Sequence, residues 1–424
     1  MIHRKHFPGF ARVRPRRTPV LLAALAGLAL LTTWPAAEGA ETLTEQEAVR
    51  RALSRPAVQD ALQGGIETAE ADALEARLWP NPHFDYEHES TGSAGGDVTE
   101  QRARLSQTFD LSGRRALRSE AAEQRVAASQ HDGTVRRATL ATQVRHVFHE
   151  SLAATRRIAV LHDWQSALLR AEDTLTKLQR GGEVSGYDRR RIARERLSAD
   201  ARLAEALAES ERSRERLSAL TGVPTDATLA GDPLPGDPPV LETLLAQVPM
   251  RGDLRALAAR TQAHGAERKA AARAWIPDVT LGAGIKSVEE SGRNDSGVLF
   301  SVSVPIPIFE HGQAAGQRAT AQARATQGEY QLALAQAQGE LRGFWRQATR
   351  LRQAAVTFAD QSPPASEDLV RIAETAYRGG EIGILELLDA YRSRLEAHTE
   401  SLELQMKARR ARIELDTLVG ADLP

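Results

Sequence analysis

The sequence predicts a mixed α and β protein that is internally duplicated and built around long α-helices. Three observations predict this class. Four sequence signals recur in the same order about 198 residues apart, as expected of a repeated structural unit. Each copy contains two short segments of alternating apolar and polar residues, which is typical of β-strands. Each copy then continues into a long Ala-rich stretch with helical spacing of its apolar residues.

The composition excludes several classes of function. The chain has 424 residues, with 55 Lys and Arg against 56 Asp and Glu, and it contains no Cys. The length allows about one to three domains. The absence of Cys excludes a disulfide scaffold, a thiolate metal site and a Cys nucleophile. The near-neutral charge argues against nucleic acid as the main partner.

The N-terminus has the three-part pattern of a secretory signal peptide. Residues 1–17 carry basic side chains and no acid, residues 20–31 are an unbroken apolar run, and residues 35–40 are mostly small. This run is too short to cross a bilayer as a helix. We expect residues 1–40 to be a signal peptide, cleaved after Gly39 or Ala40. The exported chain is then expected to be either soluble or held in a membrane by a β-barrel.

The internal repeat predicts the domain organisation. We expect a first structural repeat at residues 41–222, a Pro-rich extended linker at 223–240, and a second repeat at 241–424. The matching signals are Gly181-Gly182-Glu183-Val184 with Gly379-Gly380-Glu381-Ile382, Leu220-Thr221-Gly222 with Leu418-Val419-Gly420, Trp79-Pro80 with Trp275-Ile276-Pro277, and Ser112-Gly113 with His311-Gly312.

Each repeat is expected to begin with a helix and continue into a β-hairpin. The helices are predicted over residues 44–78 and 240–274, and they end near Pro80 and Pro277 because proline cannot continue a helix. Turns are predicted at residues 92–96 and 289–297. The strands have about the length of a membrane-spanning β-strand. Their apolar faces are predicted to contain Phe84 and Tyr86; Ala103, Leu105, Gln107 and Phe109; Val279, Leu281, Ala283 and Ile285; and Val298, Phe300, Val302 and Val304.

A long helical hairpin is expected to follow each β-hairpin. Residues 114–180 contain no proline, and as one helix they would be about 100 Å long. Pro363 and Pro364 interrupt the matching stretch of the second repeat, so a break is predicted there. The returning helices have coiled-coil seams whose small residues suit a bundle of many helices. The seams contain Ala199, Leu203, Ala206, Ser210, Ser213, Leu217 and Leu220 in one copy, and Ile384, Leu388, Tyr391, Leu395, His398 and Leu402 in the other.

Four strands cannot close a barrel, because about eight are needed to enclose even a filled interior. An open four-stranded sheet in lipid would leave two unpaired edges without hydrogen-bond partners. The strands must therefore close with those of other chains. This argument requires at least two chains, and it leaves their number open.

The chain resembles the TolC-type outer-membrane efflux proteins over nearly all of its mature length. The resemblance rests on the duplicated plan and on residues 105–115 (LSQTFDLSGRR), 302–309 (VSVPIPIF) and 377–390 (YRGGEIGILELLDA). The chain looks most like the outer-membrane components of heavy-metal tripartite pumps, the cobalt–zinc–cadmium and copper–silver RND systems.

The resemblance implies an architecture and a function. A homotrimer would form a 12-stranded transmembrane β-barrel, with four strands per chain, in the outer membrane of a Gram-negative bacterium. A long α-helical coiled-coil barrel would continue it across the periplasm. A periplasmic adaptor (membrane fusion) protein would link it to an inner-membrane RND pump. The protein would be a passive exit duct for heavy-metal cations, not an enzyme, without a cofactor and without a metal site of its own.

Three other interpretations remain open. The same duct could serve a pump for drugs or other organic compounds. A periplasmic coiled-coil scaffold would explain the low aromatic content of 4%, since outer-membrane barrels usually carry aromatic girdles. An exported adaptor with one helical hairpin is disfavoured, because the sequence predicts two hairpins and duplicated strand pairs.

Residues near the two Gly-rich turns are the candidate gate. The resemblance implies that Tyr187, Asp188, Tyr377, Glu386 and Asp389 line the closed periplasmic aperture. Threefold symmetry would turn these acids into rings, and carboxylate rings select cations. From spacing alone, the acids also fit a solvated helix start that favours the helix dipole. Ile382 stands where some relatives have an arginine of the closing network.

The turns themselves are the candidate adaptor-contacting tips. The residues concerned are Gly181, Gly182, Val184, Ser185, Gly379, Gly380 and Ile382. Glycine in these turns also has a purely local reason, since it adopts positive φ without strain. His146 and His149 are spaced i, i+3, but no third ligand is visible, so they are interpreted as a polar helix face. No convincing catalytic set is found.

Overall fold

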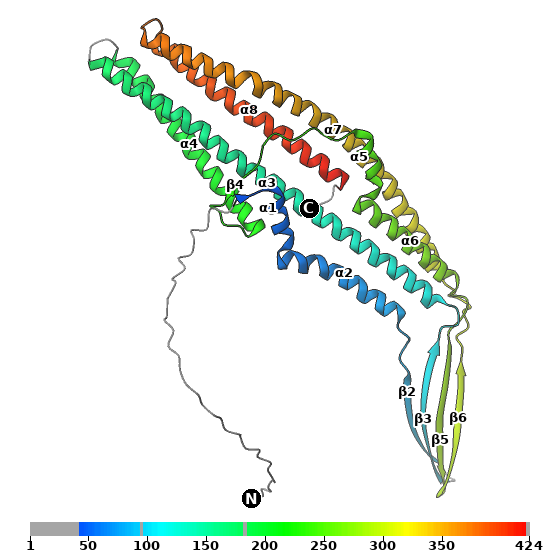
Figure 1. Ribbon diagram of the computed structural model, residues 1–424. Helices are drawn as coiled ribbons and strands as arrows, with labels where there is room; N and C mark the ends of the chain where they lie inside the picture. The colour runs from blue at the N-terminus through cyan, green and yellow to red at the C-terminus, as the bar shows by residue number, and fades with distance from the viewer. Residues whose placement is uncertain (1–41, 94–95, 181–184, 421–424) are drawn as a thin grey trace, which may run out of the picture. The chain divides into compact units, whose positions relative to one another are not determined.

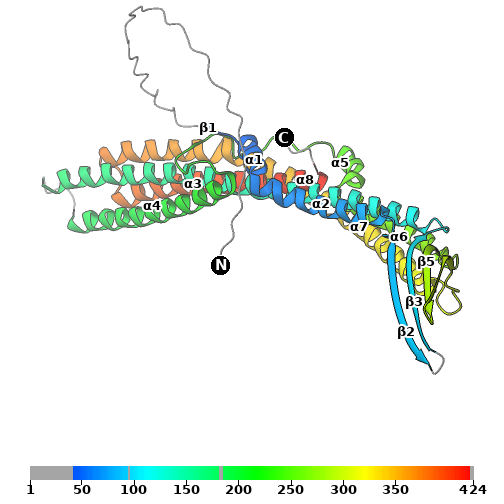
Figure 2. The ribbon, with the colours of Figure 1, turned by 90° about the horizontal axis from the view of Figure 1, so that it is seen from below.

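The computed structural model describes residues 42–93, 96–180 and 185–420 (Figure 1). The predicted signal peptide lies outside these residues. Four long helices dominate: α3 (Arg114–Arg180), α4 (Gly186–Thr221), α7 (Gln313–Arg378) and α8 (Ile384–Val419). Helix α3 packs against α4, α6 and α8, and α7 packs against α8 (Figure 2). The prediction of one continuous helix over residues 114–180 is confirmed.

The helices that precede the strands are shorter than predicted. Residues 44–78 form α1 (Glu45–Ser54) and α2 (Pro56–Arg77) instead of one helix. The break lies at Arg55, whose ψ of 133° is extended, because the ring of Pro56 disfavours a helical residue before it. The second segment forms α5 (Leu241–Gln247), a 3-10 turn (Val248–Met250) that contains Pro249, and α6 (Gly252–Ala272).

The strands form one antiparallel sheet in the order β2-β3-β5-β6. Their bounds are β2 (His83–Ser93), β3 (Gly96–Phe109), β5 (Val279–Glu290) and β6 (Arg293–Ser303). The register aligns Phe84, Leu105, Ala283 and Phe300 in one row across all four strands. The predicted apolar faces therefore coincide on one side of the sheet. That side is uncovered, since Phe300 is 78% exposed.

The other side of the sheet is polar and charged. Asp85 pairs with Arg104 at 3.1 Å, and Lys286 pairs with Glu100 at 2.8 Å. Strands β2 and β6 form the two edges, and among the described residues neither edge has a further strand beside it. The sheet thus has two chemically different faces and two open edges.

The second hairpin turn is tighter than predicted. Strand pairing continues to Glu290 and Arg293, so the turn contains only Ser291 and Gly292 instead of residues 289–297. Both residues have positive φ, of 50° and 82°. Two successive left-handed residues form a type I′ turn, whose twist matches that of the paired strands and lets them extend further.

Helix α7 continues through Pro363 and Pro364, and the predicted break is wrong. Proline in a helix interior removes a backbone donor and costs about 3 kcal/mol. Packing on both sides compensates for this loss, because Ala355 and Ser366 are buried. The Ser366 hydroxyl also donates to the carbonyl of Pro363 at 2.7 Å.

The residues between the two halves are fastened to the helices by side-chain donors. Strand β4 (Thr228–Leu229) pairs in parallel with β1 (Thr42–Leu43). Trp345 Nε1 donates to the carbonyl of Pro239 at 2.8 Å. Arg409 donates to three successive carbonyls, those of Asp232, Pro233 and Leu234. The segment therefore follows a defined path over α7 and α8.

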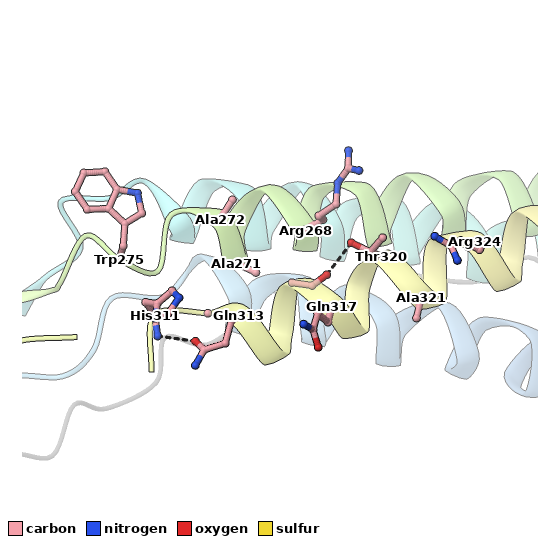
Figure 3. Close-up of a pocket in the computed structure, with 12 residues that line it drawn as sticks. Arg268, Ala271, Ala272, Trp275, His311, Gln313, Gln317, Thr320, Ala321 and Arg324 are labelled. Carbon is pink, nitrogen blue, oxygen red and sulfur yellow. Dashed lines mark hydrogen bonds between the residues drawn. The ribbon is translucent and has the colours of Figure 1, made fainter. Parts of the chain in front are cut away.

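The junctions between strands and helices differ in the two copies. In the first, the Arg115 guanidinium lies 3.8 Å from the centroid of the Trp79 ring. In the second copy, the residue that corresponds to Arg115 is Ala314, two residues after the matching Gly312. A groove of about 630 Å³ remains beside Trp275 there (Figure 3). Gly312 has a φ of 92°, and a Cβ there would lie 2.3 Å from the carbonyl of Ala271. This close approach seats the start of α7 against the end of α6.

Candidate gate at the helical tips

The candidate gate lies where α3 turns into α4 and where α7 turns into α8. Gly181, Gly182 and Val184, which were predicted to contact an adaptor, lie outside the described residues. The remaining predicted residues can be placed, and they come from both hairpins. Their local geometry decides which of them form contacts between the hairpins.

Ser185 and Asp188 form a capping box at the start of α4. The backbone N–H of Asp188 donates to Ser185 Oγ at 3.2 Å, and the Ser185 hydroxyl donates to the Asp188 carboxylate at 2.8 Å. This arrangement satisfies donors at the helix end. Tyr187 is 65% exposed, and its hydroxyl accepts from Arg191 at 3.2 Å. Asp188 thus has a helix-capping role, whatever else it does.

The second tip is built on a left-handed glycine. Gly380 has a φ of 72°, and the N–H of Glu381 donates to the carbonyl of Ala376 at 2.9 Å. Such bonds close the end of a helix, and glycine adopts the required φ without strain. Gly379 and Gly380 are exposed, whereas Ile382 is partly buried and packs inward. Ile382 therefore contributes to the core of the tip as well as to its surface.

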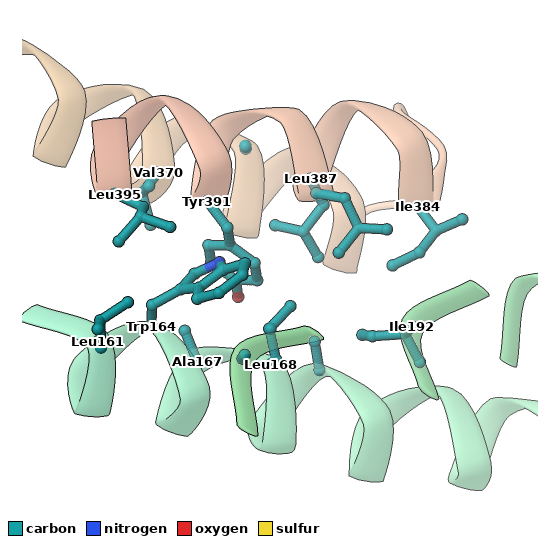
Figure 4. Close-up of a cluster of buried hydrophobic side chains, with 14 of the residues drawn as sticks. Leu161, Trp164, Ala167, Leu168, Ile192, Val370, Ile384, Leu387, Tyr391 and Leu395 are labelled. Atoms are coloured by element: carbon teal, nitrogen blue, oxygen red, sulfur yellow. The ribbon is translucent and has the colours of Figure 1, made fainter. Parts of the chain in front are cut away.

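A hydrophobic cluster below the tips joins the two hairpins (Figure 4). We call it the distal cluster. From α3 it includes Trp164 and Leu168, and from α8 it includes Leu388 and Tyr391. Trp164 and Leu388 are each 2% exposed. The distal cluster places α8 against α3, and so it fixes how the second tip sits beside the first.

Asp188 and Tyr377 come from different hairpins and influence each other through charge. The Tyr377 hydroxyl is buried and has no hydrogen-bond partner among the described residues. Burial raises the pKa of Tyr377, and the negative charge of Asp188 raises it further. The structure therefore brings these two predicted gate residues near one another without a hydrogen bond between them.

Glu386 and Asp389 lie in the first turns of α8 and are exposed. Neither carboxylate has an ion-pair partner within the described ranges. Unpaired acids at a helix start are favoured by the helix dipole.

An ion pair connects the tip-side halves of the two hairpins. Arg392 of α8 donates to both carboxylate oxygens of Glu195 of α4, at 2.9 and 2.5 Å. This hydrogen bonding lowers the pKa of Glu195, against the effect of burial. The neighbouring Tyr391 hydroxyl donates to Glu374 at 2.9 Å, which ties α8 to α7. Burial and this contact raise the pKa of Tyr391.

The two histidines considered as metal ligands are engaged separately. His146 contacts Glu414 at 2.9 Å, and His149 contacts Glu45 at 2.6 Å. No group of three or more His, Asp or Glu side chains suited to a metal ion occurs in the described part of the chain.

Comparison with known proteins shows what the chain is similar to. The family described as outer membrane efflux protein matches residues 244–421. The chain resembles that family over these residues. It is 27% identical to the cobalt-zinc-cadmium resistance protein CzcC of Cupriavidus metallidurans over 401 residues, which is 93% of this chain and 94% of that protein.

Solved structures share the fold of this chain. A membrane protein from Pseudomonas aeruginosa matches with a TM-score of 0.76 at 20% identity, over 88% of this chain and 90% of that one. CusC matches with a TM-score of 0.75 at 17% identity, over 90% of this chain and 93% of that one. The predictions of an outer-membrane efflux protein and of its location are confirmed.

Sequence reasoning missed parts of the candidate site. Trp164 could have been found, because apolar residues recur at 161, 164, 168, 171 and 175 with helical spacing. Glu195 and Arg392 carried no such signal, since each is one charged residue among many along its helix. None of the helices within the described residues is both long and apolar enough to cross a membrane.

Proposed function

We propose that this protein is the exit duct of a tripartite efflux system and that it passively conducts heavy-metal cations out of the cell. In this proposal three chains assemble and contribute four strands each to a 12-stranded barrel. The long helices continue the barrel as a tunnel across the periplasm. Residues 1–40 are removed as a signal peptide, and residues 223–240 join two structural repeats, 41–222 and 241–424. The proposal assigns no catalysis to the chain.

The single observation that carries the proposal is the two-faced sheet with open edges. Phe300 and Val298, on the apolar face of the sheet, are each 78% exposed, whereas the hydrophobic residues packed between the helices are buried. A large exposed apolar face suits lipid. The polar face suits a water-filled interior. Edges at β2 and β6 need partner strands, and copies of the same chain supply them.

The proposal gives the tips two roles. Tyr187, Asp188, Tyr377, Glu386 and Asp389 line the closed aperture, where threefold symmetry repeats the exposed carboxylates of Glu386 and Asp389. Rings of carboxylates favour cations over anions. The tip residues contact an adaptor protein that leads to an inner-membrane pump: Gly181, Gly182, Val184, Ser185, Gly379, Gly380 and Ile382.

Heavy-metal cargo is supported by the similarity to a cobalt-zinc-cadmium resistance protein over 93% of the chain. Deleting the gene and comparing growth on zinc, cobalt, cadmium, copper and silver with growth on dyes, detergents and antibiotics tests this point. Selective metal sensitivity, restored by the intact gene, is expected. Sensitivity to the organic panel alone would keep the duct and reassign its cargo.

The membrane face is tested by a matched pair of substitutions. Phe300 and Ser301 are neighbours in β6 and point to opposite faces of the sheet. We expect Phe300→Arg to remove the chain from the outer-membrane fraction, since an arginine on a lipid-facing strand costs about 2–4 kcal/mol near mid-bilayer. Ser301→Arg, on the polar face, should leave a heat-sensitive trimer in that fraction. Equal behaviour of the two variants would contradict the barrel, as would a soluble monomer.

A further inference from the structure

The apolar face of the sheet is too short to cover the hydrocarbon core of a bilayer by itself. Along β6 this face is apolar from Val298 to Val304, one residue past the end of the strand. Six residues of strand span about 20 Å, and a barrel tilt of about 40° reduces this to a height of about 15 Å. A membrane barrel carries an apolar band about 25 Å tall, so about 10 Å must come from other residues. The next row toward the hairpin turns cannot supply it, because that row is polar: His88, Gln101, Ser287 and Ser296.

The missing part of the band lies between β6 and α7. We call residues 304–309 the junction segment. The alternation of β6 continues through this segment after the strand itself has ended, because Val304, Ile306 and Ile308 stand at every second position. Ile306 is 77% exposed, Ile308 is 69% exposed and Phe309 is 89% exposed. The apolar surface of the sheet therefore extends past its last paired residues toward the helices (Figure 1).

The backbone of the junction segment also suits lipid. An N–H group without a partner is strongly unfavourable in hydrocarbon, whereas in water it finds a partner at once. Pro305 and Pro307 have no N–H to satisfy. The N–H of Ile308 donates to the carbonyl of Ile306 at 2.9 Å. The two prolines also offer a neighbouring strand no donors, so lipid fits this segment better than a second copy of the chain does.

Aromatic side chains stand at the helix-side end of this extended surface. Trp275 is 63% exposed and Trp79 is 48% exposed, and each stands four residues before a strand begins. The Trp79 ring packs edge-on against Phe109, with 6.1 Å between the ring centroids. Tryptophan concentrates where the hydrocarbon of a membrane meets its headgroups. Together with Phe309, these rings place that boundary where the helices begin, beyond the ends of the strands.

We propose that the junction segment is immersed in the periplasmic leaflet of the outer membrane, where its side chains contact phospholipid acyl chains. Extending the apolar band from Val298 to Ile306 brings its height to about 20 Å, and Ile308 and Phe309 supply the rest. The polar rows near the hairpin turns then stand outside the hydrocarbon. This inference rests on the proposed duct, and it names the lipid-binding surface that fixes the depth of the duct in the membrane.

The depth of each position can be measured with a fluorescent label, because the chain contains no Cys. Val298→Cys, Val302→Cys and Ile306→Cys, all at exposed positions, would carry the fluorophore NBD in the purified full chain. The chain is reconstituted in phosphatidylcholine vesicles that contain lipids with a nitroxide either at the headgroup or near the end of the acyl chain. Iodide in the buffer reports contact with water.

The extended band predicts a specific depth profile. Its middle lies near Val302, so the acyl-chain nitroxide should quench the label there on the order of twofold more than the label at Val298. The label at Ile306 should be quenched by the nitroxide lipids and only weakly by iodide. Without the junction segment, a bilayer of ordinary thickness would have to centre on β6 itself, near Val298.

Ser301→Cys and Gln322→Cys are the matched controls. Ser301 is the neighbour of Val302 and lies on the polar face of the sheet. Gln322 is an exposed residue of α7 beyond the junction segment. Neither label should be quenched by the nitroxide lipids. Lipid quenching of both controls as strong as at Ile306 would overturn the proposal, because the quenching would then not report immersion.

The remaining outcomes separate the junction segment from the duct. Strong iodide quenching at Ile306 with lipid quenching at Val302 would keep the barrel and overturn immersion of the segment. Protection of Ile306 from iodide and from both nitroxides would mean that a second copy covers the segment, which would also overturn it. So would lipid quenching that is greatest at Val298. No lipid quenching at any of the three positions would contradict the proposed duct itself, and the inference with it.

Discussion

Nε2 of His149 lies 2.6 Å from Oε2 of Glu45, and this contact fastens α1 to the middle of α3. The His149 side chain is 3% exposed, and its Nδ1 has no partner among the described residues. A carboxylate only accepts hydrogen bonds, so Nε2 carries the proton. Because burial also lowers the pKa of His149, the ring is neutral at pH 7 and Nδ1 is then unprotonated.

This geometry predicts a pH dependence of stability. Burial lowers the pKa of His149, with Glu45 acting in the opposite direction and the charges of Arg409 and His146 adding to the decrease. Arg145 also contacts Glu45 and faces the same site. The unfolded chain binds a proton near pH 6.5, but the folded chain does so only at lower pH. Stability should therefore fall as the pH drops below about 6.5.

Protonation of Glu45 also lowers the stability of the fold, but at lower pH. Burial alone would raise its pKa, but the hydrogen bond to His149 and the nearby positive charges outweigh burial and lower it. A depressed carboxylate pKa stabilises the fold above the unfolded value and loses this effect as the pH falls. Protonation of His149 therefore lowers the stability of the fold in one pH range, and protonation of Glu45 lowers it further in the next lower range. A variant without the histidine separates the two effects.

The measurement is thermal unfolding at pH 5, 6 and 7, followed by circular dichroism. His149→Gln keeps a donor near Glu45 but cannot be protonated, so its midpoint should change less between pH 7 and pH 5 than that of the parent. His162→Gln, at an exposed position on the same helix, is the control and should behave like the parent. An equal midpoint shift in His149→Gln and parent would contradict this assignment.

The two prolines inside α7 predict a stabilising substitution. Pro363 and Pro364 each remove a backbone donor from a helix that nevertheless continues. Replacing both by Ala should restore two helical hydrogen bonds and raise the free energy of unfolding by about 1–3 kcal/mol. Urea unfolding of the double variant checks this. Pro238→Ala, in the segment between the repeats, is the control and should have a much smaller effect on the free energy of unfolding. A destabilised double variant would contradict the prediction and would show that the two prolines set a bend that the fold needs.

The prolines also show what local sequence signals can and cannot predict. Alternation predicted the strand faces, because every second residue must point to the same side, and the register of Phe84 and Phe300 confirms it. The break at Pro363 was predicted wrongly, since the burial of Ser366 is a tertiary effect that no local rule contains. The Glu195–Arg392 contact joins residues almost two hundred positions apart, and it follows only from how the hairpins pack.

Gly284 in β5 predicts a sharp difference between two glycines of the same sheet. A Cβ at this position would lie 2.3 Å from the carbonyl oxygen of Ala103 and 2.9 Å from Cα of Arg104, both in the backbone of β3. Backbone cannot move aside without separating the two strands. Gly284→Ala should therefore destabilise the sheet by more than about 2 kcal/mol.

Gly297 in β6 is the matched control, because a Cβ there meets nothing within 4 Å. Gly297→Ala should leave folding unchanged. The two variants are compared by the yield of heat-sensitive oligomer on unheated gels and by the thermal midpoint. Equal yields would mean that β3 and β5 are not in the close contact that the register describes.

Arg409 predicts how firmly the segment between the two repeats is held. Nη2 donates to the carbonyls of Asp232 and Leu234 at 2.6 and 3.0 Å, and Nε donates to that of Pro233 at 3.2 Å. Burial lowers the pKa of Arg409, but an arginine remains charged at any physiological pH. One guanidinium therefore satisfies three carbonyls that the proline-rich backbone cannot pair within regular structure.

Replacing Arg409 by Met should keep the volume of the side chain and leave these carbonyls without their donor. Hydrogen bonds to a charged group contribute about 1.5–3 kcal/mol each, and losing a shared donor should cost about 2–4 kcal/mol in all. Limited proteolysis should then cleave residues 232–236 faster than in the parent, while Arg410→Met, at an exposed neighbouring position, should not accelerate cleavage. Arg409→Lys should fall between them, because an ammonium keeps the charge but cannot span three acceptors in the geometry of the guanidinium. Cleavage at the parent rate in Arg409→Met would mean that Trp345 and the β1–β4 pairing hold the segment without the arginine.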